Sequence, residues 1–73
     1  MKTIRELREE HGWSQFELAI RAKVTPGTVG NWERGNTEPK ASQLKRLAQV
    51  FGVTMDSIEL PEQEESAEGK AVA

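Results

Sequence analysis

Apolar residues recur every three or four positions through the first sixty residues, which is the spacing of helices that bury one face. The first helix starts at Thr3, whose hydroxyl can accept a hydrogen bond from a free amide, while the Glu6 carboxylate can reach back to the Thr3 amide. Ile4 and Leu7 form its apolar side. The pattern therefore predicts a short helix between Thr3 and the stop signal at Gly12.

The same start signal recurs at the next two helices. Ser14 and Glu17 form a second reciprocal pair of this kind, known as a capping box. Thr25 can cap the following helix, and Pro26 occupies its first position. The fixed φ of proline suits a helix, and the amide hydrogen that proline lacks would have no partner within the helix at this position. Gly35 ends that helix. Two capped helices with about three residues between them have the spacing of a helix-turn-helix motif.

The apolar positions of these two helices predict which sides face the core. Leu18 and Ala19 on the first, and Val29 and Trp32 on the second, lie at three- and four-residue spacing. The opposite side of the second helix faces solvent or a partner and comprises Pro26, Gly27, Thr28, Gly30, Asn31 and Arg34. Such a polar face is as often a hydrated surface as a binding site, so the pattern alone leaves both interpretations open.

Two further helices are predicted before the composition changes. A loop over Asn36–Pro39 precedes a helix from Lys40 to Phe51, which a glycine ends. Thr54 can then cap a fifth helix that runs to about Glu59. The predicted fold is therefore all-α, with five short helices packed as a bundle.

The chain is predicted to hold one folded domain and a tail. Residues 1–60 form the domain, because 73 residues are too few for two separate cores. Residues 61–73 hold few large apolar side chains and many charges, which is typical of disorder. We expect a solvated acidic tail there, and a linker or a partner-binding arm remains open as an alternative.

The net charge of −2 is unevenly divided. Residues 1–60 hold nine Lys or Arg against eight Asp or Glu, which gives +1, while residues 61–73 hold one against four, which gives −3. A nearly neutral domain neither favours nor excludes a polyanionic partner. No run of about 18 apolar residues could span a membrane, and no secretory signal opens the chain, so we expect a cytoplasmic protein.

Candidate catalytic or metal-binding side chains are sparse. The chain has no cysteine, and its single histidine, His11, supplies too few ligands for a metal. Ser14 and Ser42 fit helix-capping or surface positions better than the position of a nucleophile. Neither a paired-carboxylate site nor a glycine-rich phosphate loop occurs. We therefore expect neither an enzyme nor a bound cofactor or metal.

Family motifs run in register through residues 3–60. They are Ile4–Glu10, Gly12, Ser14-Gln15, Glu17–Ala19, Val24-Thr25, Thr28-Val29, Trp32–Gly35, Pro39, Leu44, Arg46–Ala48, Phe51–Val53, Asp56 and Ile58. On these residues the chain resembles the phage-repressor and Cro type of helix-turn-helix, the xenobiotic-response-element family. The resemblance implies a lambda-repressor-like five-helix bundle with its helix-turn-helix at the second and third helices. It also implies a small prokaryotic or phage transcriptional regulator that binds double-stranded DNA, with the third helix in the major groove.

The resemblance assigns roles to individual positions. It implies that the bases are faced by Pro26, Gly27, Thr28 and Asn31. The Asn31 amide can donate and accept in one plane, which matches the N6/N7 edge of adenine. It implies that phosphates are contacted by Gln15, Arg34, Asn36, Thr37 and Lys40.

Other implied features concern the fold and the strength of base reading. Arg8 and Glu33 match a structural ion pair of the family, and Lys23 stands where many members have glycine, so we expect a positive φ there. Pro26 lacks an amide hydrogen and Gly27 lacks a side chain. These two positions can therefore contribute little to base reading by hydrogen bonding.

An alternative function and a possible self-association remain open. The alternative is an antitoxin-like or adaptor-like protein-interaction domain that keeps the fold but reads bases weakly; it is motivated by Pro26-Gly27, by Glu38 beside the phosphate positions and by the acidic tail. Val50, Met55 and Leu60 are apolar and near the C-terminal end of the domain. They either close the core or form a weak homodimer through the C-terminal helix.

Overall fold

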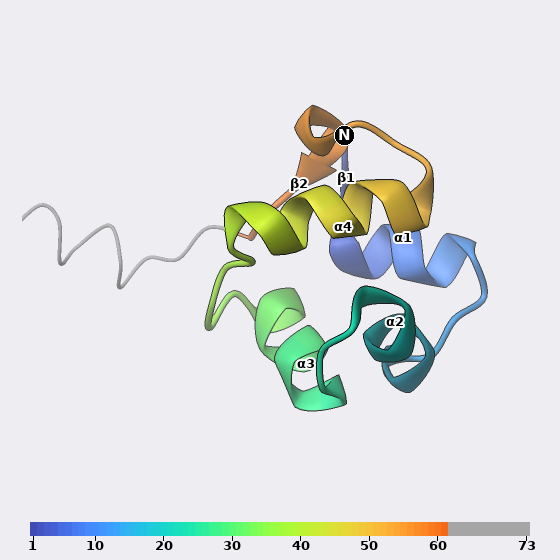
Figure 1. The fold of residues 1–73 in the computed structure, drawn as a ribbon, viewed down its shortest axis with the longest axis vertical. Helices are drawn as coiled ribbons and strands as arrows, with labels where there is room; N and C mark the ends of the chain where they lie inside the picture. The colour runs from blue at the N-terminus through green and yellow to red at the C-terminus, as the bar shows by residue number, and fades with distance from the viewer. Residues whose placement is uncertain (62–73) are drawn as a thin grey trace, which may run out of the picture.

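The computed structural model describes residues 1–61, which fold into four α-helices, one turn of 3-10 helix and two very short strands (Figure 1). The elements are β1 (Lys2–Thr3), α1 (Ile4–Glu10), α2 (Gln15–Ala22), α3 (Pro26–Arg34), α4 (Ala41–Phe51), η1 (Met55–Ser57) and β2 (Ile58–Glu59). The acidic tail predicted over residues 61–73 lies outside the described residues from residue 62 onward. No helix within residues 1–61 is long and apolar enough to cross a membrane.

Side chains close the starts of α1 and α2, as the sequence predicts. Thr3 Oγ1 accepts a hydrogen bond from the Glu6 amide at 3.1 Å, and Glu6 Oε1 accepts one from the Thr3 amide at 2.9 Å. Ser14 and Glu17 make the same reciprocal pair at 3.0 and 2.8 Å. Because each box satisfies two amides that the helix itself leaves unpaired, it fixes where the helix begins.

The helix ends are also marked by the sequence. Gly35 and Gly52 end α3 and α4 in the left-handed region, with φ of 81° and 74°. Lys23 ends α2 with φ of 64°, which confirms the expected positive φ at a residue that has a Cβ. The start of α4 differs, because Lys40 has no side-chain acceptor; its amide instead donates to Gln43 Oε1 at 2.7 Å.

The prediction of a fifth α-helix from Thr54 to Glu59 is wrong, because a single 3-10 turn, η1, is followed by the strand β2. The Thr54 hydroxyl pairs with the Ser57 hydroxyl at 2.8 Å and makes no side-chain cap to the backbone. Ile58 is extended, is buried in the core and pairs in parallel with Lys2. This pairing stops the helix after one turn.

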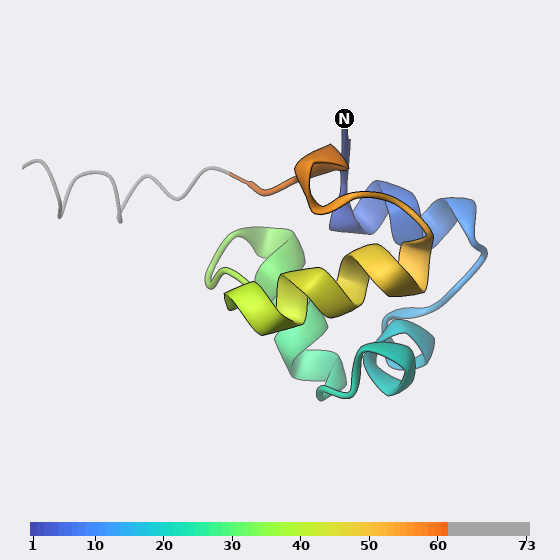
Figure 2. The same cartoon turned by 45° about the horizontal axis from the view of Figure 1, so that its top comes forward.

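The two strands join the beginning and the end of the folded domain. Lys2 lies opposite Ile58 and Thr3 lies opposite Glu59 in a parallel register that the sequence analysis did not predict. Strands of two residues carry no readable alternation of apolar and polar positions. Both views place this pair at one end of the domain, with α2 and α3 side by side at the opposite end (Figures 1 and 2).

The core receives side chains from all four α-helices. Leu18, Val29 and Leu47 are completely buried, and Ile4 and Trp32 are 1% and 2% exposed. Every inward position predicted for α2 and α3 is buried. Each fully buried large apolar side chain contributes about 1.5–3 kcal/mol, so these contacts fix how α3 sits on the rest of the domain.

Candidate nucleic-acid interface

The turn that joins α2 to α3 is short and is fixed at both ends. The Val24 amide donates to the Ala19 carbonyl at 3.0 Å. At the other end, Thr25 Oγ1 accepts from the Thr28 amide at 3.2 Å, and Pro26 is the first residue of α3. Because α2 and α3 also pack directly against each other, the outer side of α3 has a defined orientation.

The four residues predicted to face bases lie at the surface of α3. Pro26 and Gly27 are exposed, and Thr28 and Asn31 are half-buried. A Cβ added to Gly27 would find its nearest neighbour at 3.9 Å, so the space over the first turn is open. The Thr28 hydroxyl hydrogen-bonds to the Thr25 hydroxyl at 2.9 Å and retains capacity for another partner.

Three polar side chains form a cluster at the C-terminal end of α3. Asn31 Oδ1 accepts hydrogen bonds from Arg34 Nη2 at 2.9 Å and from Asn36 Nδ2 at 3.3 Å. Arg34 folds back over Gly30, where an added Cβ would lie 3.2 Å from Arg34 Nη1. Gly30 is therefore buried beneath Arg34, which corrects its expected exposure to solvent or a partner. The structure thus brings one predicted base reader together with two predicted phosphate contacts.

The remaining phosphate candidates after α3 lie along the loop to α4. The amides of Asn36 and Thr37 donate to the Asn31 carbonyl at 2.9 and 3.4 Å, so the loop folds back onto the end of α3. The Thr37 side chain is exposed, as is Lys40 immediately before α4. Glu38 is exposed between them and adds a negative charge to this edge.

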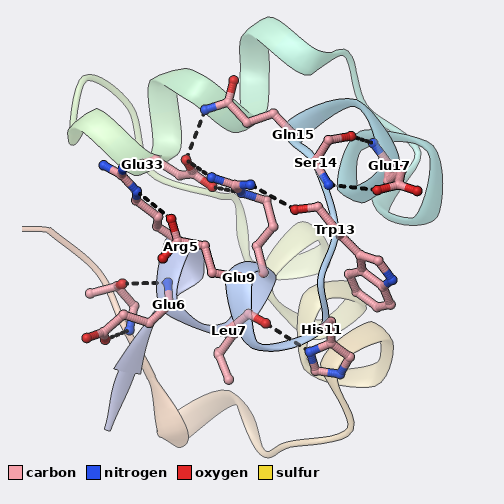
Figure 3. A network of polar contacts seen from close by, with 12 residues as sticks. Arg5, Glu6, Leu7, Glu9, His11, Trp13, Ser14, Gln15, Glu17 and Glu33 are labelled. Atoms are coloured by element: carbon pink, nitrogen blue, oxygen red, sulfur yellow. Dashed lines mark hydrogen bonds and ion pairs between the residues drawn. The ribbon is translucent and has the colours of Figure 1, made fainter.

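A largely buried polar network ties α1 and the start of α2 to α3 (Figure 3). Arg8 Nε donates to Glu33 Oε2 at 2.7 Å, and Arg8 Nη2 donates to Oε1 at 3.2 Å. Arg8 Nη1 donates to the Trp13 carbonyl at 2.8 Å. The Arg8 and Glu33 side chains are only 12% and 5% exposed. The ion pair that the family resemblance implied is therefore present and shielded from water.

Gln15 joins the same network. Its Nε2 donates to Glu33 Oε1 at 2.9 Å, so one of its two amide hydrogens is held between the start of α2 and the last turn of α3. The sequence analysis missed this contact, because no local spacing relates residues that belong to different helices. Hydrogen bonding to Glu33 raises the pKa of Arg8 above its usual value, and burial lowers it by less. Arg8 therefore stays a cation that balances the buried carboxylate.

A second group missed by the sequence analysis surrounds Trp13. The Arg21 guanidinium lies over the Trp13 ring at 4.2 Å, and the His11 and Phe51 rings lie 4.4 and 6.0 Å from it. Arg46 Nε donates to the Arg21 carbonyl at 3.3 Å. This group packs α2 against α4, and none of the predicted DNA contacts belongs to it. Among residues 1–61, no three His, Asp or Glu side chains gather as a metal site requires.

Comparison with known protein families identifies the family to which this sequence is similar. The sequence profile of a family described as Helix-turn-helix matches residues 4–58, from the start of α1 to the first residue of β2. The chain belongs to the helix-turn-helix family. The match includes both halves of the Arg8–Glu33 pair as well as α2 and α3, so the network and the outer side of α3 lie within the helix-turn-helix domain.

Several curated proteins share this helix-turn-helix domain. Over 44 residues the chain is 41% identical to the 26 kDa repressor protein of Escherichia phage HK022, covering 60% of this chain and 18% of that protein. It is 33% identical over 55 residues to the HTH-type transcriptional regulator DdrOP3 of Deinococcus deserti, which covers 75% of this chain and 43% of that protein. It is 30% identical over 57 residues to the competence pilus inhibition repressor of Acinetobacter baylyi, which covers 78% of this chain and 52% of that protein.

The helix-turn-helix chain spans only part of each of these relatives. The covered share runs from 18% of the phage protein to 52% of the Acinetobacter protein. No solved structure matches the chain significantly.

Proposed function

We propose that this helix-turn-helix domain binds double-stranded DNA as the sequence-reading part of a prokaryotic or phage transcriptional regulator that acts in the cytoplasm. The observation that carries the proposal is the outer side of α3, which the rest of residues 1–61 leaves accessible. Pro26 and Gly27 leave its first turn open, and Thr28 and Asn31 place polar groups beside that opening. Relatives named as repressors and as a transcriptional regulator support the same assignment.

In this proposal α3 enters the major groove, where the edges of the four base pairs differ in their donors and acceptors. Asn31 and Thr28 read base edges by hydrogen bonding. Pro26 and Gly27 contribute close apolar contact and room for the DNA, because neither offers a side-chain donor. The narrow set of polar readers predicts a modest preference among sequences, supplemented by DNA shape.

Phosphate contacts set the register of α3 in the groove. The proposed contacts come from Gln15, Arg34, Asn36, Thr37 and Lys40. Two of these side chains are cations, and Glu38 opposes them, so the electrostatic attraction is limited. Three to five such contacts predict that log K falls with log salt at a slope of about −3 to −4.5.

Self-association is proposed to be weak in the absence of DNA. Val50 and Leu60 pack partly against the core, while Met55 is 44% exposed. Within this C-terminal group, the exposed part of Met55 offers far less apolar area than a stable dimer buries. Sedimentation at millimolar protein concentration should therefore show a monomer or a weak dimer. A tight dimer would contradict this part of the proposal.

Selection of bound duplexes from a random pool tests the DNA-binding proposal. We expect an enriched sequence for the wild type and loss of preference at one base pair for Asn31→Ala. Lys45→Ala is the matched control, because Lys45 is exposed on α4 and is not among the proposed DNA contacts. The proposal fails if no sequence is enriched and retention does not depend on salt.

A second candidate function has one specific observation in its favour. Phe16 and Ile20 are 61% and 62% exposed at i, i+4 positions of α2, which is an apolar pair suited to a protein partner. Amide chemical shifts discriminate between the two functions. Adding mixed-sequence duplex DNA should shift the residues of α3 if DNA is the ligand. A response confined to α2 on adding a protein partner would favour the interaction domain.

A further inference from the structure

The orientation of the Asn31 amide is determined by its neighbours. A guanidinium group carries only hydrogen-bond donors, so the Asn31 atom that faces Arg34 Nη2 at 2.9 Å must be the carbonyl oxygen. Asn36 Nδ2 approaches the same oxygen at 3.3 Å. The two contacts occupy both lone pairs of Asn31 Oδ1. We refer to Arg34 and Asn36 acting on this oxygen as the Asn31 clamp.

Gly30 makes room for the Asn31 clamp. The Arg34 side chain lies back along α3 over Gly30, and its guanidinium occupies the space beside a position that has no Cβ. Asn36 reaches the cluster because its own amide donates to the Asn31 carbonyl at 2.9 Å. The clamp is therefore supported by backbone contacts as well as by side chains.

The clamp leaves Asn31 with donors only. No acceptor within residues 1–61 takes a hydrogen from Asn31 Nδ2, whereas Oδ1 already accepts two hydrogen bonds. We propose that Asn31 reads a guanine through its NH₂ group, an inference that rests on the proposed DNA binding. Arg34 and Asn36 are the positioning residues that set this preference. Guanine presents two adjacent acceptors, N7 and O6, at its major-groove edge.

Adenine is disfavoured by the same geometry. Its N6 amino group is a donor, and pairing with it requires a free asparagine oxygen. With Oδ1 occupied, the adenine amino group would face the Asn31 amino group, donor against donor. The clamp remains compatible with phosphate binding, because Arg34 gives one N–H to Asn31 and has four others.

The proposal is tested by duplex selection with four proteins. They are the wild type, Asn31→Ala, the double variant Arg34→Met/Asn36→Ala and the charge control Lys40→Met. Arg34, Asn36 and Lys40 are exposed, so these changes leave the core intact. At the base pair whose preference Asn31→Ala erases, the wild type should select G·C over A·T by about 5-fold or more. The double variant should shift that position toward A·T, whereas Lys40→Met should weaken binding to all duplexes without changing the preferred base.

Each result has a defined meaning. An A·T preference of the wild type at the Asn31 position overturns the proposal, as does an unchanged G·C preference in the double variant. If Asn31→Ala erases no preference while other positions stay enriched, Asn31 is not a reader and the inference fails. If no protein enriches any sequence, the proposed DNA binding itself has failed. If the double variant binds too weakly for selection, the wild-type preference decides alone.

The clamp can also be measured without DNA. The side-chain amide resonances of Asn31 in the free protein should shift when Arg34→Met/Asn36→Ala removes both donors. The same resonances should be unaffected by Lys40→Met, because the hydrogen bonds of the Asn31 side chain within residues 1–61 come from Arg34 and Asn36. Unchanged resonances in the double variant would show that the clamp is not formed in solution, and the proposal would then be rejected.

Discussion

Replacing Glu33 by glutamine removes one charge from the buried network while keeping nearly the same shape. The carboxylate accepts three hydrogen bonds, two from Arg8 and one from Gln15, with its side chain 5% exposed. Glutamine has one acceptor oxygen, so its NH₂ group must face a donor at one of the two oxygen positions. Glu33→Gln therefore leaves at least one buried donor without an acceptor.

The expected loss is large relative to the stability of this domain. Losing a charge-assisted hydrogen bond costs about 1.5–3 kcal/mol, and removing a partner from a buried ion pair outright costs about 3–5 kcal/mol. A folded part of this size has a total stability of roughly 3–9 kcal/mol at about 0.05–0.15 kcal/mol per residue. We therefore expect Glu33→Gln to lower the free energy of unfolding by about 1.5–3 kcal/mol, and Glu33→Ala to lower it by about 3–5 kcal/mol.

Urea denaturation followed by fluorescence measures this loss, because Trp32 is 2% exposed in the folded state and becomes solvated on unfolding. Glu9→Gln is the matched control. Its partner Arg5 lies at 3.2 Å in a pair whose side chains are 67% and 55% exposed, so the same chemical change should cost no more than about 0.5 kcal/mol.

A double-mutant cycle isolates the ion pair. The effect of Glu33→Gln should shrink by at least about 1 kcal/mol when measured in an Arg8→Met background, because the pair is then already broken. Equal losses for Glu33→Gln and Glu9→Gln, or additive effects of the two network variants, would refute the account of this network as a main support of the fold.

Three further predictions concern a helix end, a helix start and pH. Lys23→Gly should raise the free energy of unfolding by about 1 kcal/mol, because φ at this position is 64° and glycine has no Cβ to clash there. Lys23→Ala should leave the free energy of unfolding nearly unchanged, because alanine keeps the Cβ. Thermal unfolding compares the two variants. Ser14→Ala should lower it by about 1 kcal/mol through loss of the α2 cap, also measured by thermal unfolding. The raised pKa of Arg8 means that the ion pair is fully stabilising below the unfolded-state pKa and is lost only as pH rises through the higher folded-state pKa. The stability difference between wild type and Arg8→Met, measured by urea titration, should therefore stay constant from about pH 7 to 10, and a decline within that range would contradict the assignment.

Local signals in the sequence predicted most of the helices. The reciprocal pairs at Thr3 and Ser14 and the glycine stop at Gly35 act within one helical turn, so neighbouring residues suffice to identify them. The fifth helix was mispredicted for the opposite reason. Ile58 is held extended by Lys2, which lies at the other end of the domain, and no local pattern reports such a partner.

The candidate site was predictable as a set of positions but not as an arrangement. Family resemblance predicted that Asn31, Arg34 and Asn36 contact DNA, yet it did not relate them to one another. Their hydrogen bonds depend on the space over Gly30 and on the way the loop folds back after α3. The contact between Gln15 and Glu33 likewise depends on how two helices cross, which only coordinates show.

The pairing of β1 with β2 determines which part of the domain opens first. Each strand has only two residues, and their pairing must close nearly the whole chain into a loop, whereas the helices form from neighbours within about a microsecond. β1 and β2 are therefore the last segments to form during folding and the first to open in the folded protein. Hydrogen exchange should be rapid at Lys2 and Ile58, while the amides of α2 and α3 stay protected. Local opening of the β1–β2 pair therefore leaves the surface of α3 unchanged.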